Sequence, residues 1–172
     1  MMTETDVGEI LDRLDAAGIE AWLDGGWGVD ALLGEQTRLH NDLDLIVRVD
    51  DVAEMRRILA GKGFRLVTGE PASNFVLRDE RGREIDVHPV RFAYDGNGIY
   101  RMDNGEDWVF PAAGFAGAGR LGSRAVRCLT ADVQMVDHST GYEPGDTDFH
   151  DMQLLNARFG TRLLPPYDRP RA

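Results

Sequence analysis

The chain has 172 residues, 42% of them hydrophobic and 28% charged, a composition typical of a folded protein rather than a disordered one. Its formal net charge of -11 disfavours binding to nucleic acid, because neutralising a phosphate backbone requires basic patches. The N-terminus lacks a basic region followed by an apolar stretch, and no apolar run reaches the ~20 residues of a membrane span. We therefore expect one domain over residues 1–172, no membrane partner and a cytoplasmic location.

The N-terminal part alternates helices and strands around a glycine pair. Apolar residues at helical spacing predict a helix over residues 6–17, and residues 20–23 resemble a short strand. The Asp-Gly-Gly sequence of residues 24–26 predicts a tight turn, followed by a short helix over residues 27–34 that ends at a glycine. Residues 42–47, DLDLIV, alternate polar and apolar side chains, which predicts a strand with one buried and one acidic face.

The middle of the chain is predicted to be a helix followed by a meander of strands. An aspartate before residue 52 can cap a helix over residues 52–60, which the sequence GKG ends. Three strand-like runs then follow, over residues 64–68, 74–79 and 83–90. Residues 91–122 are rich in glycine and irregular, so we expect a long loop there, with room for short strands that the pattern does not define.

The C-terminal part is predicted to contain one more strand and two helices. Residues 124–129 form the strand, and Cys128 within it is expected to be a buried structural thiol. Thr130 can cap a helix over residues 131–138, and a final helix is expected over residues 148–159 before a proline-containing tail.

Three carboxylates lie on strand-like segments in a pattern that suits a metal ion. Alternate side chains of a strand share a face, so Asp42 and Asp44 point the same way, as do Asp86 and His88. If the two strands are neighbours, Asp86 joins the pair. Carboxylates that repel one another at this spacing suit Mg²⁺, whose remaining positions are usually filled by water and substrate phosphates.

The glycine pair supplies a second part of the pattern. Gly25 and Gly26 let backbone N–H groups approach phosphate oxygens at a helix N-terminus, and Arg38 is the arginine nearest to them in sequence. His40 is either a loop residue or a nucleotide contact. Alone, a glycine pair is usually a structural turn and an Asp-x-Asp pair a solvated face; the ordered combination favours a nucleoside triphosphate site.

Other polar residues have structural interpretations. Trp27 is expected to pack in the core behind the glycines, and His88 more often belongs to a packed or solvated strand face than to a site. Histidines and aspartates near the final helix could imitate a metal cluster, but acidic residues are favoured at a helix start in any case. They are His138, Asp146, Asp148, His150 and Asp151.

With these residues in order, the chain resembles the antibiotic nucleotidyltransferases of the polymerase-β-like superfamily. The resemblance rests on GGWGVDALLGEQTRLHNDLDL and, downstream, EIDVHPV. It is greatest to the small lincosamide nucleotidyltransferases, which share WLDGGWGVD and a late GY loop, here Gly141 and Tyr142, followed by two aspartates. More distantly it resembles the aminoglycoside 2''-adenylyltransferases. The resemblance implies an α+β nucleotidyltransferase fold, a mixed sheet flanked by helices with a C-terminal helix appended.

The resemblance also implies a reaction, the transfer of AMP from ATP to a hydroxyl with release of pyrophosphate. Asp42 and Asp44 would hold one or two Mg²⁺ ions, and Asp86 would accept the acceptor proton or help bind a second ion. Nucleotide contacts are then expected from five residues. These are Gly25, Gly26, Arg38, His40 and Tyr142.

The expected acceptor is a small hydroxylated and cationic molecule, a lincosamide before an aminoglycoside, because an acidic protein attracts cations. Residues 91–122 differ from those of the lincosamide enzymes and are where acceptor contacts are expected. Two alternatives are a protein AMP transferase of a toxin-neutralising type and a non-catalytic nucleotide-binding module. A homodimer that shares clefts would deepen the acceptor site of so small a chain.

Overall fold

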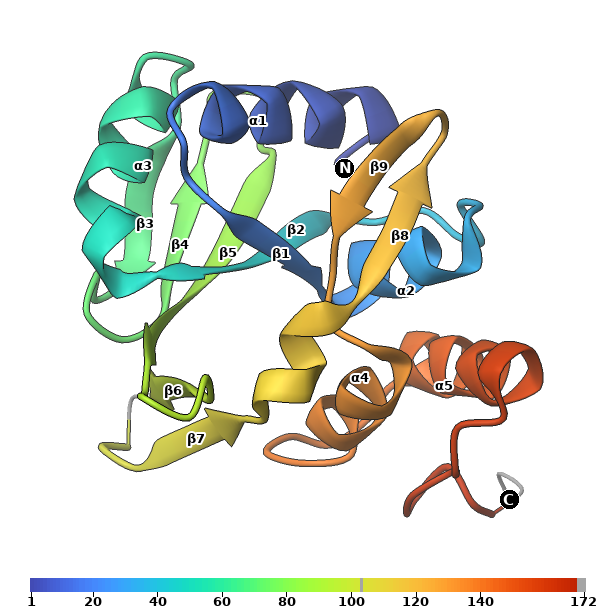
Figure 1. The fold of residues 1–172 in the computed structure, drawn as a ribbon. Helices are drawn as coiled ribbons and strands as arrows, with labels where there is room; N and C mark the ends of the chain where they lie inside the picture. The colour runs from blue at the N-terminus through green and yellow to red at the C-terminus, as the bar shows by residue number, and fades with distance from the viewer. Residues whose placement is uncertain (103, 170–172) are drawn as a thin grey trace.

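The computed structural model describes residues 1–102 and 104–169. Its centre is a mixed sheet in which one pair of neighbouring strands is parallel and the other pairs are antiparallel (Figure 1). Its main path runs β1-β2-β5-β4-β3, with β6 paired to β5 and β7 to β6. The strands are β1 (Ala21–Asp24), β2 (Asp42–Arg48), β3 (Arg65–Gly69), β4 (Phe75–Arg78), β5 (Glu84–Phe92), β6 (Gly98–Arg101) and β7 (Asp107–Phe110). The fold is therefore the mixed α+β arrangement that the sequence predicted.

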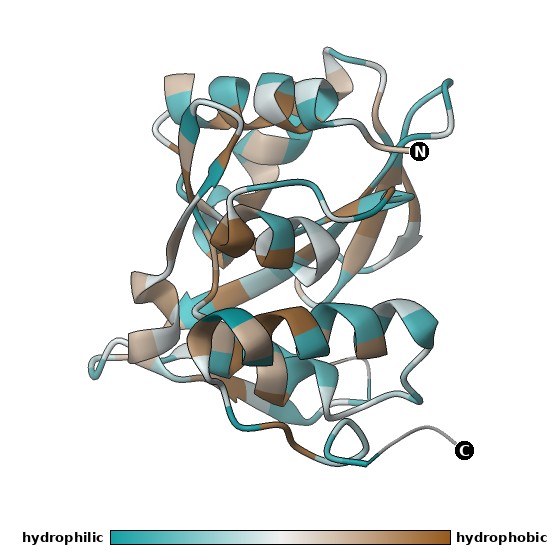
Figure 2. Ribbon diagram, turned by 90° about the vertical axis from the view of Figure 1, so that its right-hand side faces the viewer, coloured by the Kyte–Doolittle hydropathy of each residue, from teal (hydrophilic) through white to brown (hydrophobic). Residues whose placement is uncertain are grey.

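Two groups of helices surround this sheet. In Figure 1, α1 (Glu4–Ala16) and α3 (Val52–Ala60) lie at one end, and α2 (Gly25–Leu33), α4 (Ala131–His138) and α5 (Asp146–Phe159) lie at the other. The outer helices alternate hydrophobic and hydrophilic residues (Figure 2), as expected where one face packs on the core. None of the helices within the described residues is long and apolar enough to cross a membrane.

The main core lies between α1, α3 and the sheet. It contains the apolar positions of β2 and β5 together with the inward faces of both helices. Leu43, Leu45, Ile85 and Val87 have no exposed surface, which confirms the alternation predicted for these two strands. Trp27 and Cys128 are buried in the same core, as predicted.

The start of α2 differs from the expected turn. Helix α2 begins directly at Gly25, and the carboxylate of Asp24 accepts a hydrogen bond from the Gly25 N–H over 2.9 Å. Gly25 has φ +55, so the sharp change of direction is made by a glycine that is already the first helical residue. The chain thus passes from β1 into α2 without an intervening loop.

The glycine-rich segment expected as a loop contains regular structure. It holds β6, β7, the 3-10 helix η2 (Ala112–Ala116) and β8 (Ala118–Leu121), which pairs with β9 (Arg124–Arg127). Its glycines allow close packing: a Cβ on Gly119 would lie 2.3 Å from the carbonyl oxygen of Ala31, and one on Gly98 would lie 2.6 Å from the Phe115 ring. A high glycine content predicts irregular backbone. Glycine also occurs where backbone segments meet closely, however, and composition alone does not distinguish the two.

A buried charged cluster joins α1 to the turn between β4 and β5. Arg83 donates to Asp79 over 2.7 Å and to Asp6 over 2.5 Å. Burial opposes ionisation of both carboxyl groups, but hydrogen bonds from Thr3 to Asp6, and from Arg83 to both, outweigh it and lower the two pKa values below 3.8.

We expect Arg83→Met to lower the free energy of unfolding by roughly 3 kcal/mol at pH 7, because it removes the buried guanidinium that binds both carboxylates. Both pKa values are lowered in the folded state, so the stabilisation is complete above about pH 4 and is lost as the pH falls through the folded values. Urea denaturation of both proteins between pH 2.5 and pH 7 should therefore give curves that converge at low pH. A difference that does not change with pH would contradict this assignment.

Candidate active site

Three carboxylates lie abreast at one end of the sheet. Strand β1 pairs antiparallel with β2 so that Asp24 is opposite Asp44, and β2 pairs in parallel with β5 so that Asp44 is opposite Asp86. The sequence predicted that Asp86 would join the Asp-x-Asp pair if its strand were a neighbour, and the β2–β5 pairing meets that condition. Asp24 is an additional member that the sequence reasoning did not single out.

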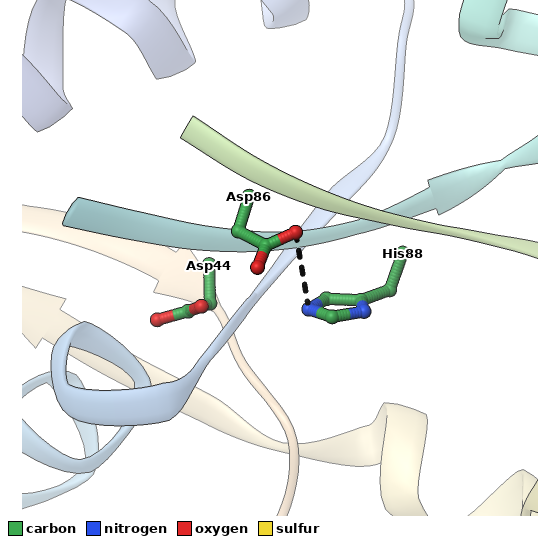
Figure 3. Close-up of side chains that lie close together, drawn as sticks. All are labelled: Asp44, Asp86 and His88. Atoms are coloured by element: carbon green, nitrogen blue, oxygen red, sulfur yellow. Dashed lines mark ion pairs between the residues drawn. The ribbon is translucent and has the colours of Figure 1, made fainter. Parts of the chain in front are cut away.

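A possible cation site lies within this row. One ligand atom each from Asp44, Asp86 and His88 all lie within 4.8 Å of one another (Figure 3). His88 Nε2 is 3.8 Å from Asp86 Oδ1, and Asn74 donates to the same oxygen over 2.9 Å. Asp42 lies outside this group, but it is exposed and lines the same cavity.

The electrostatics of the row are those of crowded like charges. Burial, followed by the charges of Asp42, Asp24 and Asp86, raises the pKa of Asp44 well above its ordinary value. Burial also raises the pKa of Asp86, and burial together with Asp137 raises that of Asp24 to about 6. Among the described residues no arginine or lysine forms an ion pair with any of the three, so a bound cation would relieve this repulsion.

The two glycines are required by the site. A Cβ on Gly25 would lie 2.2 Å from Asp44 Oδ2, and a Cβ on Gly26 would lie 2.4 Å from both Arg38 Nη2 and His40 Nδ1. The start of α2 therefore lies directly between the carboxylates and these two basic side chains. The absence of a Cβ at both positions allows the backbone to pass close to Asp44, Arg38 and His40. The predicted approach of the glycine N–H groups to phosphate oxygens stays a prediction.

His40 is buried behind this helix start and does not line the cavity. Its Nε2 is 2.5 Å from Asp30 Oδ2, and its ring packs against Trp27 at a tilt of 39° with centroids 4.4 Å apart. Asp30 Oδ1 also accepts hydrogen bonds from the N–H and the hydroxyl of Thr37. His40 is thus placed to support Gly26 from behind, while Arg38 reaches the cavity.

Helices α4 and α5 contribute a hydrogen-bonded cluster at the cavity wall. Asp148 Oδ1 accepts from the Tyr142 hydroxyl over 2.7 Å and lies 3.0 Å from His138 Nδ1. Burial opposes ionisation of Asp148, but these two contacts and the Gly145 N–H lower its pKa to about 2. Burial disfavours the charged His138, but Asp148 and the charges of Asp24 and Asp137 raise its pKa above the ordinary value.

The carboxylate row, the two glycines, Arg38 and the His138, Tyr142 and Asp148 cluster all line one cavity of about 870 Å³, large enough for drug-sized ligands. The basic side chains in its lining are Arg38, His88 and His138, and aromatic side chains from β6 and β7 form the opposite wall. The carboxylates in its lining are Asp24, Asp42, Asp44, Asp86, Glu106, Asp107, Asp137 and Asp148. The acidic balance of the whole chain is therefore concentrated where a ligand would bind.

Sequence reasoning missed Asp24, Asp137 and His138 as cavity residues. Asp24 could have been found from its place at the end of a strand directly before Gly25, had the antiparallel pairing with the Asp44 strand been inferred. Asp137 and His138 gave no signal in the sequence, since helix α4 is brought to the cavity by its packing against α2 and α5, and the contact with α2 is non-local.

A family model described as aminoglycoside-2''-adenylyltransferase matches residues 6–155, most of the chain. The chain belongs to this family. A lincosamide resistance protein of Staphylococcus haemolyticus is 30% identical over 91% of this chain and 96% of its own length. A 2''-aminoglycoside nucleotidyltransferase of Klebsiella pneumoniae is 31% identical over 78% of this chain and 71% of its own length. This member of the family is therefore an enzyme of the nucleotidyltransferase class.

Solved structures agree with the fold. The crystal structure of the lincosamide antibiotic adenylyltransferase LnuA with lincomycin bound superposes with a TM-score of 0.80 at 29% identity, covering 91% of this chain and 98% of that one. The crystal structure of ANT(2'')-Ia with adenylyl-2''-tobramycin gives a TM-score of 0.71 at 22% identity, over 90% of this chain and 87% of that one, and supports the fold alone. The nucleotidyltransferase fold predicted from the sequence is thus confirmed.

We expect Asp44→Asn to raise the melting temperature of the metal-free enzyme at pH 8 by about 3 °C, which corresponds to roughly 1 kcal/mol. The folded pKa of Asp44 is raised, so its carboxylate destabilises the fold increasingly as the pH rises above 3.8. The gain should shrink toward pH 4, where Asp44 is itself neutral.

Thermal unfolding in the presence of a chelator measures this effect, and Glu35→Gln is the matched control because Glu35 is an exposed carboxylate away from the cavity. The control should change the melting temperature by less than about 1 °C. A melting temperature lowered by Asp44→Asn at pH 8 would show that Asp44 has a stabilising partner in the folded protein.

Proposed function

We propose that this enzyme transfers AMP from ATP to a hydroxyl group of a small cationic antibiotic, with Mg²⁺ bound and pyrophosphate released. The single observation that carries the proposal is the row of Asp24, Asp44 and Asp86 beside the glycine start of α2. Family membership supports the nucleotidyl transfer, and the site chemistry supports the metal and the acceptor charge.

The residues present fit a magnesium ion. Carboxylate oxygens are its preferred protein ligands, and Asp44 and Asp86 each offer one beside His88, with Asp42 on the same face of β2. We propose Asp42 and Asp44 as the residues that hold it, with Asp86 as the base or, in the alternative, as the third metal ligand. A bound Mg²⁺ neutralises charge on the triphosphate, which this acidic cavity would otherwise repel.

The chain's own groups then bind and orient the reactants. We propose Gly25 and Gly26 as the phosphate-binding start of α2: the Gly25 N–H is held by Asp24, so the N–H of Gly26 and those that follow it are the donors offered to phosphate oxygens, with Arg38 and Tyr142 beside them in the cavity. The acceptor oxygen bonds to the α-phosphorus as the bond to pyrophosphate breaks, and Asp86 takes the hydroxyl proton. Burial raises the pKa of Asp86, which makes it a stronger base than an exposed aspartate.

The acceptor is proposed to be a lincosamide before an aminoglycoside. The lincosamide resistance protein aligns over nearly the full length of both chains, and the lincomycin-bound structure superposes with the higher TM-score of the two. Cavity carboxylates favour an amine-bearing acceptor, and the ring of Trp108 on β7 offers an apolar surface to its body. A cytoplasmic location, where ATP is available, completes the proposal.

A pyrophosphate-release screen tests the reaction and the acceptor together. With ATP and Mg²⁺, we expect release to depend on lincomycin and to be slower with tobramycin. Excess EDTA should abolish it, because the cavity repels the triphosphate when no cation accompanies it. Full turnover in EDTA would contradict the metal, and GTP used in preference to ATP would contradict the donor.

Asp86→Asn tests the proposed base. We expect kcat to fall by at least about 100-fold, the usual contribution of a general base, with the KM for ATP changed by less than about threefold. The matched control is Asn74→Ala, which removes the hydrogen bond to Asp86 Oδ1 but keeps the carboxylate. If the KM for ATP instead rises in step with the Mg²⁺ requirement, Asp86 acts as a metal ligand rather than as the base.

A further inference from the structure

The loop between α2 and β2, residues 34–41, is fixed to the protein at two independent points. At the first point, Asp30 of α2 accepts hydrogen bonds from Thr37 and lies 2.5 Å from His40. These contacts hold the loop on either side of Arg38. Between these two residues, Arg38 extends toward the C-terminal helix, where Asp151 binds it. The backbone of Arg38 is therefore held by α2, and its guanidinium by α5.

The geometry of the second point is specific. Arg38 Nε lies 3.0 and 3.1 Å from the two oxygens of Asp151, and Nη2 lies 2.7 Å from Oδ2. This two-atom contact fixes the plane of the guanidinium as well as its position. Asp151 is 1% exposed and Arg38 is 24% exposed, so the carboxylate is buried behind the arginine and only the arginine faces the cavity.

Arg38 keeps donors for a ligand after these contacts. A guanidinium has five N–H groups. Asp151 takes one from Nε and one from Nη2, and the Leu39 carbonyl takes one from Nη1 over 3.3 Å. The remaining N–H of Nη1 and that of Nη2 have no acceptor in the parts of the chain that the structure describes. Nη2 also lies against Gly26, since a Cβ there would approach it to 2.4 Å.

We infer that Asp151 is a positioning residue for the nucleotide donor: it orients Arg38 against Gly26 so that two free guanidinium N–H groups and the N–H groups of α2 that follow Gly25 face the same phosphates. The inference rests on the proposed function, because it assigns the phosphate end of the donor to this side of the cavity. It gives α5 a part in the donor site although Asp151 does not line the cavity.

Two other roles for Asp151 make different predictions. If the ion pair only attaches α5 to the rest of the protein, its loss lowers stability and affects all ligands alike. If Asp151 only neutralises Arg38, its removal leaves a stronger cation in the cavity and tightens the binding of ATP. A positioning role weakens ligands that carry phosphates and leaves others unchanged.

The test compares ATP with adenosine by isothermal titration of the full chain, with Mg²⁺ present and no acceptor. We expect Asp151→Asn to raise the Kd of ATP by at least about tenfold, the loss of one charge-assisted hydrogen bond, and to change the Kd of adenosine by less than about twofold. Equal losses for both ligands, an unchanged Kd for ATP or tighter binding of ATP would each overturn the inference.

A double variant shows whether Asp151 acts through Arg38. Arg38→Gln should weaken ATP at least as much as Asp151→Asn, and adding Asp151→Asn to it should change the Kd of ATP no further. The double variant also leaves no unpaired charge, so it remains informative if Asp151→Asn alone does not fold. An additional loss in the double variant would show that Asp151 acts independently of Arg38 and would overturn the inference.

Asp79→Asn is the matched control, because Asp79 is also a buried carboxylate bound to an arginine but lies outside the cavity. It should lower the melting temperature without changing the ratio of the two Kd values; a changed ratio would mean that loss of stability alone explains the Asp151 result and would overturn the inference. Failure of the wild-type enzyme to bind ATP would instead refute the proposed donor, which separates that failure from failure of the positioning role.

Discussion

The pairing register of β1, β2 and β5 is the constraint on which the site depends. It brings Asp24, Asp44 and Asp86 abreast, an arrangement that like charges oppose. The opposing force comes from the other face of the same strands, where Leu43 and Ile85 are fully buried neighbours. A slip of one residue in the pairing of β2 or β5 would turn the carboxylates of that strand into the core and its apolar side chains into the cavity. The hydrophobic core therefore specifies the active-site geometry.

The C-terminal helix α5 also affects the charge of the cavity. Asp148 and Asp151 lie three residues apart on α5, and each binds a basic side chain of the cavity, His138 and Arg38 respectively. Each cation is thereby oriented but also largely neutralised. The cavity remains acidic, and a triphosphate can enter it favourably only together with a cation, whereas an amine-bearing acceptor needs no such help.

Much of this arrangement could be predicted because it depends on local periodicity. The alternation in DLDLIV and EIDVHPV assigned each carboxylate to a face, and it placed the leucines opposite them in the core. Most helices were predicted to within a few residues for the same reason. The neighbouring position of β2 and β5 followed only from a resemblance to a known superfamily, since strand pairing is non-local.

The residues that sequence reasoning missed depend on contacts between distant segments. Asp24 matters because β1 is antiparallel to β2, and the support of His40 by Asp30 depends on how the loop after α2 folds back. The glycines of residues 91–122 predict a long loop. The structure shows that Gly98 and Gly119 are places of close packing, so the same composition that suggests irregularity here allows strands to pack tightly.

Residues 91–122 join the sheet in a way that lets the two walls of the cavity vary independently. Strand β6 pairs with β5 only at its last three residues, from Val90 to Phe92, whereas Asp86 lies further back and is paired with β2 and β4. A change of side chain on β6 or β7 therefore alters the wall of the cavity without moving the register of the carboxylates. The acidic row depends on the buried core, and the opposite wall depends on a hairpin attached at its edge, so this fold can keep one chemistry while the wall changes to fit different acceptors.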